Sequence, residues 1–200
     1  MLYYYRGVFM KDSYHHGNLK SELIETSIRI ISEEGFEHLS LRNISSKCGV
    51  SHNAIYRHFD SKEQLIEACR SYVTECMMTQ LENSVSDTEL SSPQAIEKLS
   101  YAYISFYQKH PTYYSFLYRN SSVKLIFTLE EKEGNYPPLD FFRKAYCAYG
   151  ERIGREASET LTHLTRLWSL LHGLTALVIS QNVEWDKNWQ KCLENIIGKS

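Results

Sequence analysis

The chain has 200 residues, enough for one or two domains with a buried hydrophobic core. Its 22 Lys and Arg residues and 24 Asp and Glu residues give a net charge of −2, so a nucleic-acid-binding surface can exist only as a local basic patch. Because 13% of the residues are aromatic while only 9 are Gly and 4 are Pro, the composition disfavours disorder and a turn-rich all-β chain. Helices are the leading expectation.

The sequence pattern predicts neither a membrane span nor an export signal. The longest apolar candidate, residues 170–179, is interrupted by His172 and Gly173. The tyrosine-rich start has no apolar run followed by a cleavage site, which argues against a secretory signal. The 5 cysteines include no Cys-x-x-Cys pair, which favours reduced thiols in the cytoplasm; a redox-active thiol is the alternative.

Four helices are predicted to start close together in the N-terminal part. Residues 1–13 share no periodicity with the rest of the chain, and we expect a disordered tail or a start site at Met10. Apolar residues then recur at helical spacing from Asn18 to Gly35. Three serines mark further helix starts: Ser40 for a helix ending at Gly49, Ser51 for a helix from 52 to about 58, and Ser61, with a capping box, for a helix running to about 83.

The C-terminal half is also predicted to be helical. After a polar connection at 84–92, helices are expected at 93–109, 112–118, 137–149, 158–179 with Ser158 as its cap, and 186–197. Residues 119–136 are expected to form a loop with at most one helical turn. With eight or nine helices and no strand, the predicted fold class is all-α.

Residues 39–65 have the spacing of a helix-turn-helix, in which the second helix lies in the DNA major groove. The helix that follows Ser51 can turn an apolar face to the core, formed by Val50, Ala54, Ile55 and Phe59. Residues four apart share a helix face. The opposite face therefore carries His52, Asn53, Tyr56 and Arg57.

These exposed residue types suit DNA better than plain solvent. Asn can pair with adenine, Arg can fork onto guanine or phosphate, and a Tyr hydroxyl can reach a phosphate. Between 38 and 62 the basic residues are Arg42, Lys47, Arg57 and Lys62, against Asp60 alone. Lys62 stands at the first position of a helix, where free N–H groups also attract a phosphate. An ordinary helical corner without DNA affinity is the alternative.

The sequence from about 14 to 70 resembles the TetR/AcrR family of bacterial transcriptional regulators. The segments that carry the resemblance are Tyr14–Leu19 (YHHGNL), Glu34–Phe36 (EGF), Leu39–Ile44 (LSLRNI), Cys48–Ser51 (CGVS), Ala54–Phe59 (AIYRHF) and Ser61–Leu65 (SKEQL). Cys48 departs from the pattern, because a small residue such as Ala is usual there. The resemblance implies a helix-turn-helix DNA-binding domain at 14–62, a bridging helix at 63–83, and a ligand-binding and dimerisation domain at 84–200.

The resemblance also implies which residues meet DNA. Those near the backbone or groove are Ser40, Arg42, Tyr56, His58 and Lys62, and the variable base readers are His52, Asn53 and Arg57. For His58 a packing role is the alternative. The expected protein is a ligand-responsive repressor that binds a palindromic operator as a homodimer formed by its last two long helices. Its effector would tilt the bridging helix and change the spacing of two recognition helices about 34 Å apart.

The segment Trp168–Gly173 resembles the Trp-His-Gly type of C-terminal domain within the same family. Aromatic residues on neighbouring helices can surround His172 and make a pocket for a flat or apolar small molecule. The predicted ligand-binding residues are Tyr103, Tyr107, Phe116, Phe141, Trp168 and His172. The alternative is that they are ordinary core residues.

Two other classes of function are weaker predictions. The sequence contains no Gly-rich phosphate loop, no His-Glu-x-x-His and no nucleophile elbow, which disfavours an enzyme. Further metal ligands cannot be placed around the His15-His16 pair, so we predict neither a metal nor a cofactor. A helical partner-binding module without DNA affinity is the second alternative.

Overall fold

The computed structural model describes residues 19–120, 123–185 and 189–197. Within these ranges the chain is helical and contains no strand, which confirms the predicted all-α class. The α-helices are α1 (Leu19–Glu34), α2 (Leu41–Lys47), α3 (His52–Tyr56), α4 (Lys62–Ser84), α5 (Pro93–Lys109), α6 (Pro111–Tyr114), α7 (Pro137–Ile153), α8 (Ala157–Val178) and α9 (Trp189–Ile197). A 3-10 turn spans Phe36–His38 and a π-helical turn spans Ser115–Asn120. The predicted tail at 1–13 and the His15-His16 pair lie outside the described residues.

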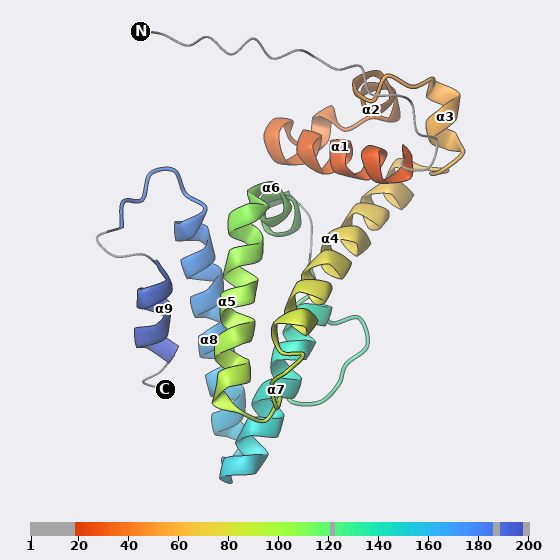
Figure 1. Cartoon of the computed structure of the whole chain (residues 1–200). Helices are drawn as coiled ribbons and strands as arrows, with labels where there is room; N and C mark the ends of the chain where they lie inside the picture. Colours follow the sequence, from red (N-terminus) through yellow and green to blue (C-terminus); the bar gives the residue numbers. More distant parts are fainter. Residues whose placement is uncertain (1–18, 121–122, 186–188, 198–200) are drawn as a thin grey trace, which may run out of the picture.

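The helices form two bodies joined by α4. In Figure 1, α1, α2 and α3 cluster at one end, and α4 runs from them into a bundle with α5, α7 and α8. The short helix α6 lies where the two bodies meet and contacts α1, while α9 packs against α5 on the far side of the bundle. A contact made by α1, α4 or α6 therefore bears on how the two bodies are oriented.

Serine caps and glycine turns set the helix boundaries of the first body. Ser40 Oγ accepts a hydrogen bond from the backbone N–H of Asn43 at 3.1 Å, and Ser61 Oγ accepts one from Gln64 N–H at 3.2 Å. Gly35 and Gly49 end α1 and α2 with φ of +98° and +66°, a region that non-glycine residues rarely adopt. These boundaries confirm the sequence predictions.

Several predicted details are wrong. The helix α3 ends at Tyr56, two residues short of the prediction, and the Ser51 side chain makes no capping hydrogen bond within the described chain. Gln64 Oε1 accepts from the N–H of Asp60 rather than that of Ser61, so the expected capping box closes one residue earlier. The cap of α8 is Glu156 and not Ser158.

Buried side chains run continuously through α4. Its core stripe is Leu65, Cys69, Val73, Met77 and Leu81, each fully buried at four-residue spacing. The N-terminal part of α4 packs against α1, and its C-terminal part packs against α5 and α7 (Figure 1). Because its apolar face is shared by both bodies, α4 couples them mechanically as well as covalently.

The described cysteines are poor candidates for redox chemistry. Cys48, Cys69, Cys76 and Cys147 are free thiols. Burial raises the pKa of each one, and that of Cys69 reaches about 12. A raised pKa disfavours the reactive thiolate.

No described helix is long and apolar enough to cross a membrane.

Candidate nucleic-acid interface and ligand pocket

The two faces of α3 differ as the sequence predicts. Ile55 is 0% exposed and Phe59, just beyond the helix, is 2% exposed, so both are anchored in the core. Tyr56 is 46% exposed, and His52, Asn53 and Arg57 are exposed beside it. The His52 and Tyr56 rings meet edge to face at 5.0 Å. The short helix α3 is thus anchored in the core by its apolar side. Its polar side, on which the His52 and Tyr56 rings contact each other, faces solvent.

The first helix of the motif adds polar groups beside this row. Arg42 is exposed on α2. The Ser40 hydroxyl accepts from Asn43 N–H, which leaves its own O–H available as a donor. The Asn43 side chain donates to the carbonyl of His38 at 3.0 Å, tying the start of α2 to the preceding turn. His58 is exposed next to Phe59, with ring centroids 6.4 Å apart.

The ion pairs alter the predicted basic patch. Lys47 Nζ lies 2.8 Å from Glu34 Oε1, and this hydrogen bond lowers the pKa of Glu34. Lys47 is therefore paired with Glu34, which partly offsets the charge that it adds to the predicted basic patch. Of the other basic residues between 38 and 62, Arg42 and Arg57 are exposed and Lys62 is half-buried.

Lys62 is half-buried at the start of α4. Its Nζ donates to the carbonyl of Phe36 at 3.2 Å. An ammonium has three N–H donors, so this bond leaves two of them. Held in this way, the charge sits at the N-terminus of a 23-residue helix, where backbone N–H groups favour an anion.

A junction between the two bodies was missed by sequence reasoning. Glu25 Oε1 on α1 accepts a hydrogen bond from Tyr72 Oη on α4 at 2.8 Å and another from Tyr113 Oη on α6. Ser32 Oγ on α1 donates to the carbonyl of Thr112 at 2.7 Å. Because these bonds join residues that are far apart in the sequence, no local sequence pattern could have predicted them.

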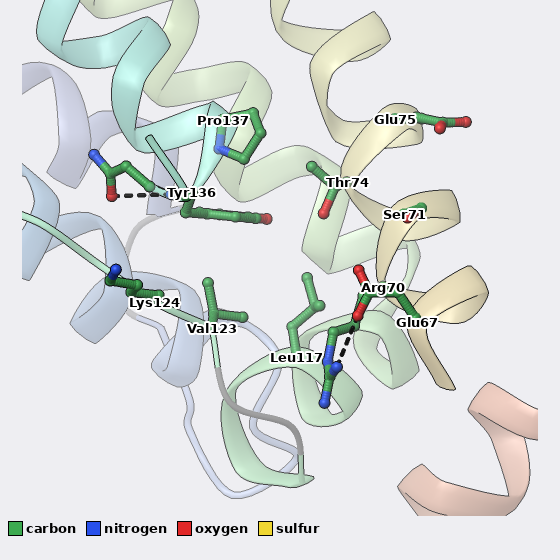
Figure 2. A pocket seen from close by; sticks show the side chains of 12 residues that line it. Glu67, Arg70, Ser71, Thr74, Glu75, Leu117, Val123, Lys124, Tyr136 and Pro137 are labelled. Atoms are coloured by element: carbon green, nitrogen blue, oxygen red, sulfur yellow. Dashed lines mark hydrogen bonds and ion pairs between the residues drawn. The ribbon is translucent and has the colours of Figure 1, made fainter. Parts of the chain in front are cut away.

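A pocket opens between α4 and the loop that precedes α7. Its volume is about 460 Å³, and the residues around it include Arg70 and Thr74 of α4, Leu117, Lys124 and Tyr136. Figure 2 shows the Tyr136 side chain reaching across the pocket toward Thr74, with the Glu67–Arg70 pair on the α4 side. Lys124 and Val123 face it from the loop. We call this space the α4 pocket.

Asn135 holds the loop that forms one wall of the α4 pocket. Its Oδ1 accepts from the N–H groups of Ile126 and Tyr136 at 2.8 and 2.9 Å. Its Nδ2 donates to the Ile126 carbonyl at 3.1 Å and to Asp140 Oδ1 at 2.9 Å. With four bonds from one amide, the loop is fixed at the start of α7, and Tyr136 is fixed with it.

Behind Tyr136 lies a cluster of aromatic residues around His172. Tyr103 Oη lies 3.1 Å from His172 Nε2 and 3.2 Å from Tyr118 Oη. Tyr107 Oη lies 3.2 Å from Tyr136 Oη, which connects the cluster to the α4 pocket. Burial lowers the pKa of His172 to about 4, so the ring is neutral at pH 7.

The structure brings most of the predicted ligand-binding residues together. Tyr103, Trp168 and His172 are mutual ring neighbours, with centroids 5.2 to 5.9 Å apart, and Tyr107 stacks edge-on against Tyr103. Phe116 is fully buried in the same core. Phe142, rather than Phe141, meets the rings of Tyr103 and Trp168. Sequence reasoning also missed Tyr118 and Tyr136.

Two polar atoms in this region lack partners. Trp168 Nε1 and Thr175 Oγ1 are buried on α8 and have no hydrogen-bond partner among the described residues. Buried polar groups are normally satisfied, so these two atoms are exceptions within the described core.

The arrangement defines a helix-turn-helix protein with a helical companion domain. Residues 23–69 match the bacterial regulatory proteins of the tetR family, and residues 96–199 match the tetracyclin repressor-like C-terminal domain. The second match alone spans more than half of the chain. The protein therefore belongs to the TetR family of bacterial regulators.

Individual relatives match this chain to different extents. The HTH-type transcriptional regulator YerO of Bacillus subtilis (strain 168) is 34% identical over 79 residues, which are 40% of this chain and 27% of YerO. The nucleoid occlusion factor SlmA of Vibrio campbellii is 26% identical over 95 residues, 47% of this chain and 48% of SlmA. The matched part thus spans about a quarter and about half of these relatives. The crystal structure of a TetR-like transcriptional regulator from Rhodococcus sp. RHA1 has a TM-score of 0.68 at 16% identity, covering 93% of this chain and 97% of that one, and shows a shared fold.

Proposed function

We propose that this protein is a cytoplasmic transcriptional repressor that binds a palindromic DNA operator as a homodimer and releases it when a small molecule binds. The observation that carries the proposal is the row of exposed His52, Asn53, Tyr56 and Arg57 on a helix whose other face is locked in the core. Such a helix can enter the major groove without disturbing the fold.

The residue types divide into base readers and backbone contacts. His52, Asn53 and Arg57 are the proposed base readers, because the amide and guanidinium groups offer paired hydrogen bonds to base edges. The proposed backbone contacts are Ser40, Arg42, Tyr56, His58 and Lys62. Lys62 is supported by its fixed position at the N-terminus of α4, which is suited to hold a phosphate.

The proposed homodimer places two α3 helices about one DNA turn, roughly 34 Å, apart or somewhat more. The long helix α8 offers an exposed stripe for self-association, made of Arg166, Ser169, Gly173 and Leu177. Within this stripe the small residues Ser169 and Gly173 and the apolar Leu177 lie at four-residue spacing, which allows a second helix to approach closely. We assign 14–62 to DNA binding, 63–83 to the bridge, and 84–200 to ligand binding and dimerisation.

The proposed effector is a small, flat or apolar molecule that enters through the α4 pocket. Tyr136 stands between this pocket and the aromatic cluster, so its movement would admit a ligand toward Trp168 and His172. The unpaired Trp168 Nε1 would gain an acceptor from such a ligand. The pocket is bordered by α4, so occupancy would act directly on the helix that carries the DNA-binding body.

Selection of bound fragments from random DNA at a stated salt concentration tests the proposal. We expect enrichment of a two-fold symmetric site that binds about 10³-fold or more tightly than competitor DNA. Binding without preference for any sequence at low ionic strength would overturn the assignment and leave only a helical protein of this family.

A further inference from the structure

A second hollow lies at the far end of the bundle, between α7 and the beginning of α8. It has a volume of about 530 Å³ and shares no residue with the α4 pocket. Its charged and polar lining consists of Arg143, Lys144, Glu151, Arg155 and Thr160. Its three cations are accompanied by two carboxylates, Glu151 in the lining and Asp140 in an ion pair with Arg143, so the hollow has an excess of one positive charge on a chain whose net charge is −2.

Arg143 is the built-in part of this hollow. The residue is only 6% exposed, which is unusual for a charged side chain. Its Nε donates to Asp140 Oδ1 at 3.1 Å and its Nη1 donates to the Leu129 carbonyl at 2.9 Å. Its Nη2 is buried without a hydrogen-bond partner among the described residues. This guanidinium is held in place on two sides, and its third nitrogen has no acceptor among the described residues, which is exceptional for a buried donor.

The start of α8 contributes a second, independent feature. This helix is 22 residues long, and its N-cap, Glu156, makes no side-chain hydrogen bond to the first turn within the described chain. Ala157 at the first helical position lines the hollow. The backbone N–H groups of an uncapped first turn carry partial positive charge and favour an anion.

Close packing keeps the two features together. A Cβ placed on Gly150 of α7 would lie 2.7 Å from Thr160 Oγ1 of α8, so only glycine allows the two helices to approach this closely. Arg155, between the helices, lies over the Tyr149 ring at 5.5 Å, which limits where its charge can go. Lys144 is exposed at the rim.

We propose that this hollow binds a small anion carrying a phosphate group, with Arg143, Lys144, Arg155 and the first turn of α8 as its partners. A tetrahedral dianion can accept hydrogen bonds from the three kinds of donor that border this hollow, which are guanidinium groups, an ammonium and backbone N–H groups. The site uses none of the residues assigned to DNA or to the effector, so it stands whether or not the proposed function holds.

The test measures inorganic phosphate binding to the full chain. We expect isothermal titration at pH 7.5 to give saturable 1:1 binding, and the midpoint of thermal unfolding to rise with phosphate relative to chloride at equal ionic strength. The double variant Lys144→Gln, Arg155→Gln removes surface-accessible charges and should fold; we expect it to bind phosphate at least about tenfold more weakly. Arg143→Lys keeps the charge but loses the fork, and we also expect weaker binding.

The matched control is Arg152→Gln, which removes an exposed cation from the same end of α7 that pairs with Glu89 instead of lining the hollow. This variant should bind phosphate like the wild type. Equal loss in Arg152→Gln and in the double variant would mean an adventitious ion only. Absence of saturable phosphate binding to the wild type, or stronger binding of acetate than of phosphate, would also overturn the proposal. Loss of self-association in the double variant without any phosphate effect would assign the hollow to a second copy of the chain and likewise reject the anion.

Discussion

His172 on α8 makes the stability of the helical bundle of α4, α5, α7 and α8 depend on pH. Burial lowers its pKa from 6.5 to about 4 in the folded protein. As the pH falls from 6.5 toward 4, the unfolded chain takes up a proton on this ring while the folded protein does not. Since the unfolded state then binds more protons, the free energy of unfolding decreases over this window. Above pH 6.5 the ring is neutral in both states, and His172 does not reduce the free energy of unfolding.

The magnitude follows from the separation of the two pKa values. A difference from 6.5 to about 4 corresponds to about 3 kcal/mol of unfolding free energy. The ring is not fully enclosed, and solvent screening reduces the value to about 2 kcal/mol. That is a large share of the stability of a typical domain, about 5–15 kcal/mol.

Urea unfolding of the wild type and of His172→Gln at several pH values between 7 and 4 measures the effect. Carboxylates titrate in both proteins, so the difference between them isolates the imidazole. We expect His172→Gln to be less stable at pH 7 and this deficit to shrink by about 2 kcal/mol by pH 4. Tyr103→Phe is the control: it removes the hydroxyl beside Nε2 but leaves the ring buried, so its pH dependence should follow the wild type. A deficit of His172→Gln that is the same at every pH would refute the burial of a neutral ring.

Three further predictions address DNA binding, the junction and the dimer. Lys62→Ala should weaken binding to all DNA sequences alike and reduce the slope of log affinity against log salt concentration by about one. Asn53→Ala should lose about 1–3 kcal/mol of binding free energy on the selected site only. Equal losses of the two variants on random DNA would contradict the division of roles. Tyr113→Phe removes one of two hydrogen bonds to Glu25. It should lower the unfolding free energy by about 1–2 kcal/mol and speed amide exchange in α1. A change no larger than that of Tyr101→Phe, at an exposed ring on α5, would argue against the junction. Leu177→Glu should convert a dimer to a monomer in sedimentation velocity, while Phe127→Glu, at an exposed ring in the loop that precedes α7, should not. A dimer that survives Leu177→Glu would move the interface elsewhere.

The sequence predicted what depends on near neighbours along the chain. A serine cap accepts a hydrogen bond from the residue three positions ahead, and a glycine turn depends on one residue, so the starts of α2 and α4 and the ends of α1 and α2 could be placed. Proline in the first turn placed the start of α5. Four-residue spacing was enough to separate the core face of α3 from its exposed face.

The same reasoning failed where the answer depends on how two helices cross. Lys47 stands among the basic residues of the motif, and only the packing of α1 against α2 brings Glu34 to 2.8 Å from it, which the spacing could not predict. Phe141 and Phe142 are adjacent and equally apolar, so periodicity could not decide which one faces Tyr103; the crossing of α5 and α7 selects Phe142. The α4 pocket also lies between segments that are distant in sequence, so no local pattern indicated it.

The route from ligand to DNA is constrained by these long-range contacts. Leu117 borders the α4 pocket and belongs to the π-helical turn that continues α6, whose Tyr113 binds Glu25 of α1. A ligand that moves this turn must therefore either carry α1 along or break the bond to Glu25. Only a difference in ligand affinity between those two arrangements can change operator affinity. In the proposed mechanism, the junction at Glu25, and not the tightness of the pocket, would therefore determine how much of the ligand-binding energy reaches α3.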